Sequence, residues 1–526
     1  MDEATALREA NTPTRPRPAS EPRPHTGTVV AACSAVFAAQ LALVLPAAIN
    51  GEMQAGLRTT GSELTWISAT FLVPIAMFSL SFGMLGDRFG RRKILSFGAA
   101  ALTIGLLVSG ISGSLHGLWV GQAVAGVGAA AMFPTSLASI TALTPGSKQR
   151  ARGLAAWTTA LSTGALAAPP LSAALTEWSG FRWAFLGAAA FAALSLALMV
   201  ALAHDSRSPE PRQFDIPGQM TVAAGLLALL FGVIEAAERG WADPLVVASF
   251  LAAVILLAAF VFVESRAEHP LLLLSLFRIP AFAAAAVVSV IGMFGFLGGA
   301  YALSIRLGVI QHETVIHAAI PFVIIQAITP FVWPLLVRLL RRVGPRAMLV
   351  SGLVAIALAD VWLIATPVSK TGIAPILGSL VLNGLGFGLL VSALTAAAVN
   401  AVPVHLTGMA SATSSMMRDL GQTLAPAIIG SIALTRAAHL ATESLNTAGL
   451  PPEVAGPALG VLEAGGSLAL ASVPMGPQVA HIAQEALAQG YDLGLTVAAA
   501  ACAVGALVAA LFCKGGKTPA TTLEVH

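Results

Sequence analysis

The chain has 526 residues, of which 56% are hydrophobic and only 10% are charged. Because a soluble domain carries about 25% charged residues, this composition excludes an ordinary soluble protein and favours a membrane protein. The formal net charge of +3 is too small to indicate binding to nucleic acid. An odd number of cysteines, all in or beside apolar runs, argues against a disulfide framework. They are Cys33, Cys502 and Cys513.

The chain begins with a polar segment, residues 1–28, which is rich in proline and arginine and is predicted to be a disordered tail. It lacks the pattern of a cleaved signal peptide. Beyond it, apolar runs of roughly 20 residues recur, each long enough to cross about 30 Å of hydrocarbon as a helix. We predict fourteen spans, with twelve or thirteen as alternatives. The runs are 29–50, 64–85, 94–113, 118–143, 153–176, 183–203, 216–236, 245–264, 280–306, 317–337, 347–366, 374–398, 416–435 and 490–513.

Lysine and arginine are distributed unevenly between the two sides that these spans define. If both termini lie on the same side as the loop at 86–93, that side holds 22 of the 28 Lys and Arg residues. Cytoplasmic loops of membrane proteins are enriched in these residues. The sequence therefore predicts that both termini are cytoplasmic.

Short strings recur along the chain at nearly constant offsets. DRFGRRKIL (87–95) aligns with RRVGPRAML (341–349) at an offset of 254, and AGVG (125–128) aligns with NGLG (383–386) at an offset of 258. Because the matching strings follow the same order along the chain over several helices, they predict two six-helix halves of parallel orientation. We place these halves at 29–203 and 280–513, with two inserted helices at 216–264 and a second tail at 514–526.

The longest connection predicted on the external side is 436–489. It mixes glycine, proline, alanine and acidic residues. Two interpretations stay open for it: short amphipathic helices on the outer surface, or a flexible linker.

The segment 83–93, GMLGDRFGRRK, joins two apolar runs and concentrates four cations, one acid and three glycines in a short loop. Charges are costly in hydrocarbon, so this loop is predicted to lie at the membrane–water boundary. The pattern resembles the loop between the second and third helices of the major facilitator superfamily of secondary transporters. The matching positions are Gly83, Gly86, Asp87, Arg88, Gly90, Arg91 and Arg92.

Further strings resemble the fourteen-helix drug:proton antiporter branch of this superfamily, and the resemblance covers nearly all of residues 29–513. It implies an all-α integral membrane protein in which Asp87 and its arginines form a latch. The latch would hold the halves together on the cytoplasmic side in the outward-facing state, whereas the alternative is that these charges only fix topology. The strings are FDIPG (214–218), HPLLLLSLFR (269–278), GMASATSSMMRDLG (408–421) and WSGFRWAFL (178–186).

The antiporter signature of the fifth helix is partly kept, because Gly164 and Pro169 fit it. Two other positions depart from the family pattern. Phe37 stands where this branch carries an aspartate, and Gln122 stands where the fourth helix carries an arginine. The usual proton site of the N-terminal half is therefore absent.

Two acids are the candidates for proton coupling in its place. Asp360 is the acid that lies deepest within a predicted membrane span. By its position in the repeat, however, its helix is expected to lie at the periphery and not to line the cavity. Asp419, next to Arg418, begins a helix that is expected to line the cavity, and a structural ion pair of these two is the competing interpretation.

The resemblance also implies a central cavity that is weakly polar and almost free of fixed charge. Such a surface suits lipophilic neutral molecules, or diffuse cations that stack on tryptophan. The competing interpretation of each side chain is helix packing. The candidate lining residues are Gln40, Trp66, Gln122, Trp157, Tyr301, Gln326, Trp333, Asn383 and Met417.

The sequence contains no phosphate-binding loop, no metal-spaced His/Cys cluster and no nucleophile motif, so we predict no cofactor, metal site or enzymatic activity. We predict a secondary transporter of the bacterial inner membrane that exports drugs, antibiotics or lipid-like metabolites by alternating access, with proton antiport as the family default. One alternative is an uncoupled facilitator or lipid-type transporter of the same fold. The other is a non-transporting membrane sensor or partner protein.

Overall fold

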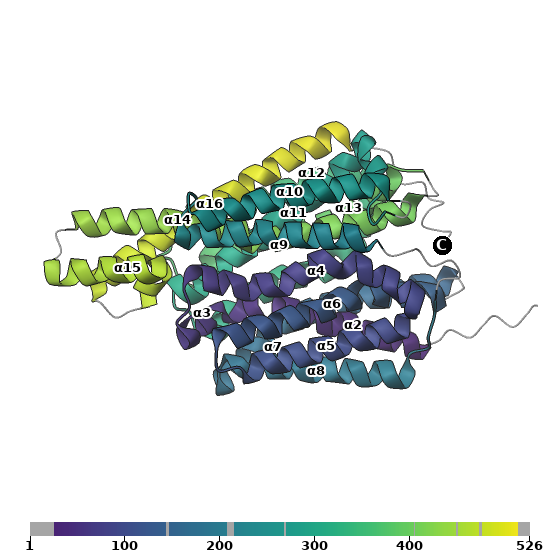
Figure 1. Cartoon of the computed structure of the whole chain (residues 1–526), viewed down its shortest axis with the longest axis horizontal. Helices are drawn as coiled ribbons and strands as arrows, with labels where there is room; N and C mark the ends of the chain where they lie inside the picture. The colour runs from purple at the N-terminus through teal and green to yellow at the C-terminus, as the bar shows by residue number, and fades with distance from the viewer. Residues whose placement is uncertain are drawn as a thin grey trace, which may run out of the picture.

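The computed structural model describes residues 26–143, 147–207, 215–267, 270–403, 406–448, 451–472 and 476–513. Within these ranges the regular structure is helical, and the long helices run side by side along the long axis of the molecule (Figure 1). Twelve of the described helices are long and apolar enough to cross a bilayer. The predicted tails lie outside the described residues, except that the first helix already begins at Thr26.

The first seven helices, which we call the N-terminal group, form one side of the bundle (Figure 1). Pro46 has no N–H group to continue a helix, so the first apolar run is realised as two helices that meet at Leu45. Two loops in this group turn at glycines with positive φ, 109° at Gly90 and 90° at Gly180. The group comprises α2 (Thr26–Val44), α3 (Pro46–Leu57), α4 (Gly61–Phe89), α5 (Arg91–Ile111), α6 (Leu115–Leu143), α7 (Ser147–Ser179) and α8 (Phe181–Leu202).

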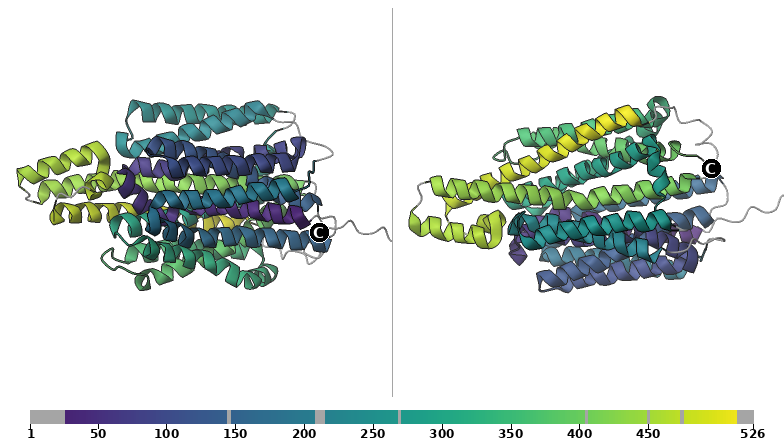
Figure 2. Two further views of the ribbon diagram at one scale, coloured as in Figure 1. Left: turned by 90° about the horizontal axis from the view of Figure 1, so that it is seen from below. Right: turned by 45° about the horizontal axis from the view of Figure 1, so that its top comes forward.

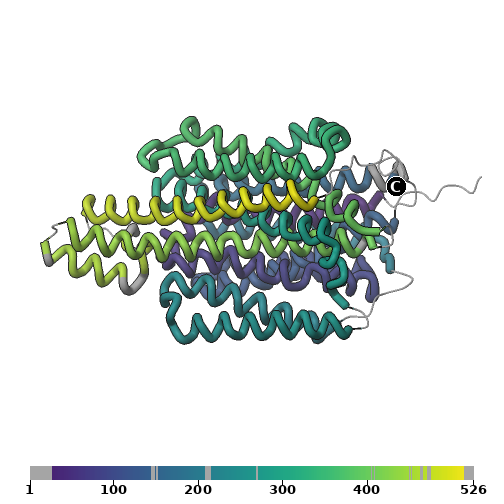
Figure 3. The backbone as a smooth tube through the Cα atoms, turned by 90° about the horizontal axis from the view of Figure 1, so that it is seen from above, coloured from purple at the N-terminus to yellow at the C-terminus, as the bar shows by residue number. Residues whose placement is uncertain are grey.

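Two inserted helices follow, α9 (Ile216–Arg239) and α10 (Pro244–Arg266). Each begins after an aspartate whose carboxylate accepts a hydrogen bond from a backbone N–H of the first turn, at 2.9 Å for Asp215 and 2.8 Å for Asp243. The pair lies along the edge of the bundle beside α4 (Figures 2 and 3).

The remaining helices form what we call the C-terminal group. Its α12 has 51 residues, and a straight helix of this length would measure about 76 Å, more than twice the ~30 Å hydrocarbon core. Gly344 has a non-helical backbone (φ 80°, ψ 169°), so α12 consists of two legs that hold the predicted runs 317–337 and 347–366. The group comprises η1 (Leu274–Arg278), α11 (Pro280–Ile305), η2 (Arg306–Ile310), α12 (Val315–Ala365), η3 (Ala374–Ile376), α13 (Leu377–Asn400), α14 (Thr407–Thr447), α15 (Pro452–Ser472) and α16 (Pro477–Phe512).

The same close helix crossing occurs in both groups, at positions related by the repeat. A Cβ on Gly98 of α5 would lie 2.8 Å from the carbonyl oxygen of Gly128 in α6. The equivalent glycines are Gly352 of α12 and Gly386 of α13, where a Cβ on the first would lie 3.0 Å from the carbonyl oxygen of the second. Small residues allow membrane helices to approach this closely. Offsets of 254 and 258 between these pairs match those of the aligned strings.

The ends of α14 and α16, with the whole of α15, project beyond the other helices (Figures 1 and 3). We call residues 436–447, α15 and residues 477–489 the protrusion, and its side of the molecule the protruding end. The opposite side, where α2 begins and α16 ends, is the tail end. The protrusion has its own apolar core, so the described part of 436–489 is packed helix and not a flexible linker. This core contains Ala441, Leu445, Ala458, Leu462, Leu470, Val479, Ala483 and Ala486.

Polar contacts tie α9 to α4 near both of its ends. Toward the tail end, the Gln219 amide donates to the carbonyl of Met77 at 2.9 Å and accepts a hydrogen bond from Ser81. Toward the protruding end, the Glu238 carboxylate accepts a hydrogen bond from the backbone N–H of Ser62 at 3.1 Å. The contact of α9 with α14, in the C-terminal group, is made by apolar side chains.

We expect Gln219→Leu to loosen the inserted pair, because it removes both hydrogen bonds to α4. Thr221→Ala is the matched control, since Thr221 is half-buried and its hydroxyl donates to carbonyls of its own helix. Interhelical hydrogen bonds in membranes contribute about 0.6 kcal/mol each, so the free energy of unfolding should fall by about 1 kcal/mol. Thermal unfolding in detergent measures this, and equal midpoints for the two variants would contradict it.

Candidate functional site

At the protruding end, α3 meets α11 and η2 and closes the interface between the two groups. The Asn50 amide donates to the Ser304 hydroxyl at 2.8 Å, and Ser304 donates to the carbonyl of Ala47. A Cβ on Gly51 would lie 2.5 Å from the carbonyl oxygen of Gly308, so the two backbones touch because Gly51 has no side chain. We call these five residues the glycine clamp.

A second contact between the groups lies deeper on the same side. The hydroxyls of Thr65 in α4 and Tyr301 in α11 share a hydrogen bond of 3.0 Å. Tyr301 packs against Tyr491 of α16, with ring centroids 6.3 Å apart, and both rings are buried. Helix α11 therefore carries contacts to the N-terminal group over its last two turns.

The glycine clamp joins positions that are equivalent in the repeat. Gly308 follows Gly51 by 257 positions, and Ser304 follows Ala47 by the same number. Both values fall between the sequence offsets of 254 and 258. Sequence reasoning missed the clamp, although two glycines at one repeat position were a signal that could have found it.

At the tail end, the predicted latch forms a compact charged cluster. The Asp87 carboxylate accepts two hydrogen bonds from the Arg91 guanidinium, at 2.7 and 3.0 Å. Arg92 donates to the carbonyl of Val200 in α8 at 2.6 Å. Among the described residues, no hydrogen bond or ion pair joins this cluster to α11–α16. The cluster thus stays within the N-terminal group in this conformation.

The glycines of the same loop fit it closely to its surroundings. A Cβ on Gly90, where φ is 109°, would lie 2.6 Å from both carboxylate oxygens of Asp205. Gly86 packs against Thr135 of α6. A Cβ on Gly86 would lie 3.0 Å from the methyl group of this threonine. Gly83 faces α6 in the same way, and Arg88 lies over the ring of its neighbour Phe89.

The fifth-helix signature lies where α7 crosses α2. A Cβ on Gly164 would lie 2.6 Å from the carbonyl oxygen of Phe37, so Gly164 permits this crossing. Pro169 is buried within α7, and the Ser172 hydroxyl donates to its carbonyl at 3.0 Å. The Phe37 ring packs on Phe191 of α8, with centroids 5.6 Å apart. The position where the family carries an acid thus faces a helix of the same group.

Two of the predicted cavity residues make contacts inside the N-terminal group. Gln122 is buried, and its amide donates to the hydroxyl of Ser109 in α5 at 3.0 Å. The indole N–H of Trp157 donates to Ser136 of α6 at 2.9 Å. Both side chains join neighbouring helices, which is the packing role that the sequence left open.

The other predicted cavity residues are spread over the bundle. Trp66 faces the inserted pair, because its indole N–H donates to Glu235 of α9 at 3.0 Å. Trp333 on α12 is 37% exposed. Tyr301 belongs to the interface described above, and Asn383 is buried within the C-terminal group. Three further residues are half-buried: Gln40, Gln326 and Met417.

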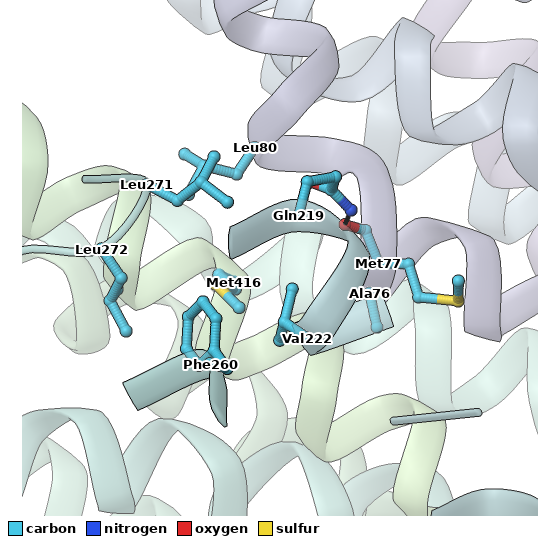
Figure 4. Close-up of a pocket in the computed structure, with 9 residues that line it drawn as sticks. All are labelled: Ala76, Met77, Leu80, Gln219, Val222, Phe260, Leu271, Leu272 and Met416. Carbon is cyan, nitrogen blue, oxygen red and sulfur yellow. Dashed lines mark hydrogen bonds between the residues drawn. The ribbon is translucent and has the colours of Figure 1, made fainter. Parts of the chain in front are cut away.

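A small pocket lies between α4, α9, α10 and α14 (Figure 4). Its walls are apolar except for Gln219, whose amide is bonded to the carbonyl of Met77. None of the nine predicted cavity residues lines it. The lining residues are Ala76, Met77, Leu80, Gln219, Val222, Phe260, Leu271, Leu272 and Met416.

The two candidate acids lie in different places. Asp419 of α14 faces Ser79 of α4 at the interface between the groups, and the Ser79 hydroxyl donates to the carbonyl of Ile75 at 2.7 Å. The structural ion pair with Arg418 that the sequence left open is not among the ion pairs of the described residues. Asp360 is only 1% exposed and lies in the second leg of α12, inside the C-terminal group.

Two helical groups related by a repeat and closed against each other at one end are typical of transporters that work by alternating access. Residues 30–426 match the Major Facilitator Superfamily. The chain belongs to this superfamily, whose members are multi-pass membrane transporters and not enzymes.

The chain is similar to several curated bacterial proteins. It is 29% identical to the multidrug resistance protein Stp of Mycobacterium tuberculosis, over 72% of this chain and 71% of the relative. It is 25% identical to the tetracenomycin C resistance and export protein of Streptomyces glaucescens, over 92% and 90%. The puromycin resistance protein pur8 of Streptomyces alboniger is 29% identical, over 81% and 86%.

Solved structures share the fold at low sequence identity. A bacterial homologue of the human lysosomal transporter Spinster, inward-facing and unoccupied, superposes with a TM-score of 0.65 at 15% identity. That match covers 95% of this chain and all of the other. A D-xylose–proton symporter gives a TM-score of 0.61 at 13% identity, over 93% and 98%.

We expect Gly51→Ala to open the glycine clamp, because its methyl group would collide with the Gly308 backbone. Gly113→Ala is the control, since nothing lies within 4 Å of a Cβ there. Spin labels at the exposed positions Ser179→Cys and Lys370→Cys, one in each group at the protruding end, report the change. The distance between them should lengthen in Gly51→Ala alone, and an unchanged distance would contradict a closing role for the clamp.

We expect Gly90→Ala to destabilise the protein more than Gly180→Ala. Both changes place a side chain at positive φ, which costs about 1–3 kcal/mol. Only the Gly90 change also meets a carboxylate, because a Cβ on Gly180 has nothing within 4 Å. Thermal unfolding in detergent should give the lower midpoint for Gly90→Ala, and the reverse order would show that the fit to Asp205 is unimportant.

Proposed function

We propose that this protein exports lipophilic or amphipathic small molecules, among them drugs and antibiotics, across the bacterial inner membrane. The names of its relatives, which refer to multidrug resistance, tetracenomycin C export and puromycin resistance, support this class of substrate. The low content of charged residues also supports it, since weakly polar surfaces suit lipophilic molecules. The observation that carries the proposal is the glycine clamp, a closed contact between two groups that the repeat relates.

We infer fourteen membrane crossings, arranged as two six-helix halves at 29–203 and 280–513 with an inserted pair at 216–264. The two legs of α12 support this count, because each is as long as a single span. Helix α7 supports it as well, since it has 33 residues and packs between α2, α8 and α12.

We place the tail end in the cytoplasm and the protrusion outside. The distribution of Lys and Arg supports this orientation, because the charged cluster of Arg88, Arg91 and Arg92 lies at the tail end. The glycine clamp then closes the external side.

Alternating access requires the clamp to open when the tail end closes. In the present conformation the clamp is shut, while Asp87 and Arg91 bond to each other and not to the described part of the C-terminal group. This arrangement corresponds to an inward-facing state with the latch disengaged. In the outward-facing state the latch residues would contact the C-terminal group instead.

Uphill export needs an energy source, and proton antiport is the coupling that we propose. Asp360 and Asp419 are the candidate proton sites. A second candidate function, uncoupled facilitation, is favoured by one observation: Phe37 occupies the family's acid position and packs against Phe191 of the same group.

The decisive experiment uses purified protein in proteoliposomes with ethidium, a fluorescent lipophilic cation, with and without an imposed pH gradient. We expect ethidium to move against its concentration gradient while the internal pH changes in step. Equilibration of ethidium that ignores the gradient would support the facilitator. No movement of ethidium, tetracenomycin C or puromycin would contradict transport and favour a sensor or partner protein.

A further inference from the structure

Asp360 is a buried acid that has no cation beside it among the residues the structure describes. It lies in the second leg of α12, about one and a half turns before the leg ends at Ala365, and is 1% exposed. Among the described residues it forms no ion pair, and its Oδ2 atom has no hydrogen-bond partner. An ionised carboxylate in such a place loses its hydration without compensation.

Three helices pack around this carboxyl group. The Oδ1 atom of Asp360 lies 2.6 Å from the position of a Cβ on Gly299 in α11. The Asn383 side-chain nitrogen, on α13, lies 3.2 Å from the same point. Cys502 of α16 is also near enough to interact electrostatically with Asp360. Gly299 thus leaves the space into which the Asp360 and Asn383 side chains both project.

Asn383 has the complementary unpaired atom. It is 5% exposed, and its side-chain carbonyl oxygen has no hydrogen-bond partner among the described residues. A carboxylate can only accept hydrogen bonds, whereas a protonated carboxyl group has one O–H to donate. A proton on Asp360 therefore removes a buried charge and supplies an O–H donor. The Asn383 nitrogen is the atom nearest to the shared space, so its carbonyl oxygen accepts from this donor once the amide group turns over.

The site lies directly behind the helix that closes the external side. Gly299 faces Asp360, while Tyr301 and Ser304 of the same helix bond to Thr65 and Asn50 of the N-terminal group. Less than two turns of α11 separate Gly299 from Ser304. A change in the volume or charge at Asp360 therefore acts on the helix that holds the external contacts.

We propose that Asp360 and Asn383 form a proton-binding site whose occupancy sets the position of α11 and thereby opens or closes the external side. The proposal rests on the transport function proposed above and assigns the coupling to this site. The Asp360 carboxylate takes one proton from external water and becomes a neutral carboxyl group, which stabilises the closed clamp. Release of that proton to cytoplasmic water leaves a charge that the closed arrangement cannot solvate, so the external side opens and admits water.

The other groups near this site do not neutralise Asp360. Arg306, on η2, donates to the carbonyls of Leu363, Thr366 and Pro367 and so caps the end of the same leg. Asp492 of α16 faces Arg306. From α16 the titratable neighbour of Asp360 is Cys502, whereas α11 and α13 present Gly299 and Asn383. Asp360 is thus the group in this cluster whose charge lacks a counterpart.

The test measures the distance between spin labels at Ser179→Cys and Lys370→Cys, with Cys33 replaced by alanine, in mildly acidic and in mildly alkaline buffer. We expect the parent protein to show the short distance in acid and a longer distance in base. Asp360→Asn, which mimics the protonated state, should keep the short distance in both buffers. This readout needs no substrate, so it tests the proton site even if the transport function fails.

Glu264→Gln is the matched control. Glu264 of α10 is also a buried carboxylate (4% exposed) with an unpartnered oxygen, but it lies in the inserted pair, away from α11. We expect this variant to respond to pH as the parent does. A pH response that persists in Asp360→Asn, or that is lost equally in Glu264→Gln, would overturn the proposal.

Transport in proteoliposomes supplies the second measurement. We expect Asp360→Asn to retain ethidium exchange without a gradient and to lose uphill movement driven by the pH gradient. If Asp419→Asn loses uphill movement and Asp360→Asn keeps it, the coupling belongs to Asp419 and the proposal fails. A short label distance restored in base by sodium chloride, but not by potassium chloride, would assign the site to sodium and overturn the proton assignment.

Discussion

The internal repeat constrains the whole molecule, because equivalent positions of the two groups meet where the groups close. The backbone contact of Gly51 with Gly308 is the clearest case, since the two glycines are repeat mates. The crossing of α5 with α6 at two glycines also has a repeat mate, because α12 crosses α13 at the two equivalent glycines. A side chain at Gly51 would separate the groups, so the geometry of the protruding end depends on this one position.

The inserted pair adds an asymmetry to this repeat. Gln219 donates a hydrogen bond to α4, and Glu235 and Glu238 accept hydrogen bonds from it, whereas the contact of α9 with α14 is made by apolar side chains. Directional hydrogen bonds fix one relative position, while apolar surfaces can slide past each other at little cost. Directional contacts therefore attach the pair to the N-terminal group, and the small apolar pocket of Figure 4 lies where the pair meets α14.

Most helices were predictable from the sequence because a span of about 20 apolar residues is a strong signal. The break between the legs of α12 was predictable too, since Gly344 and Pro345 sit in a charged loop. The sequence did not predict the direction in which each single side chain points. Gln122 was predicted to face a cavity and bonds to Ser109 of α5, because a helix that is apolar all round does not reveal which face it buries. The hydrogen-bond partner of Trp66 could not be predicted for the same reason.

The size of each free-energy contribution decides whether one proton at Asp360 can control the protruding end. An interhelical hydrogen bond contributes about 0.6 kcal/mol, so the few that close this side sum to a small stabilisation. A buried carboxylate without a partner costs several kcal/mol, which exceeds them. One pH unit supplies about 1.4 kcal/mol and 100 mV supplies about 2.3 kcal/mol per charge, so the driving force is of the right order to reset the site. A single acid behind α11 is thus energetically sufficient for the coupling proposed above, although Phe37 stands where the related antiporters carry an acid.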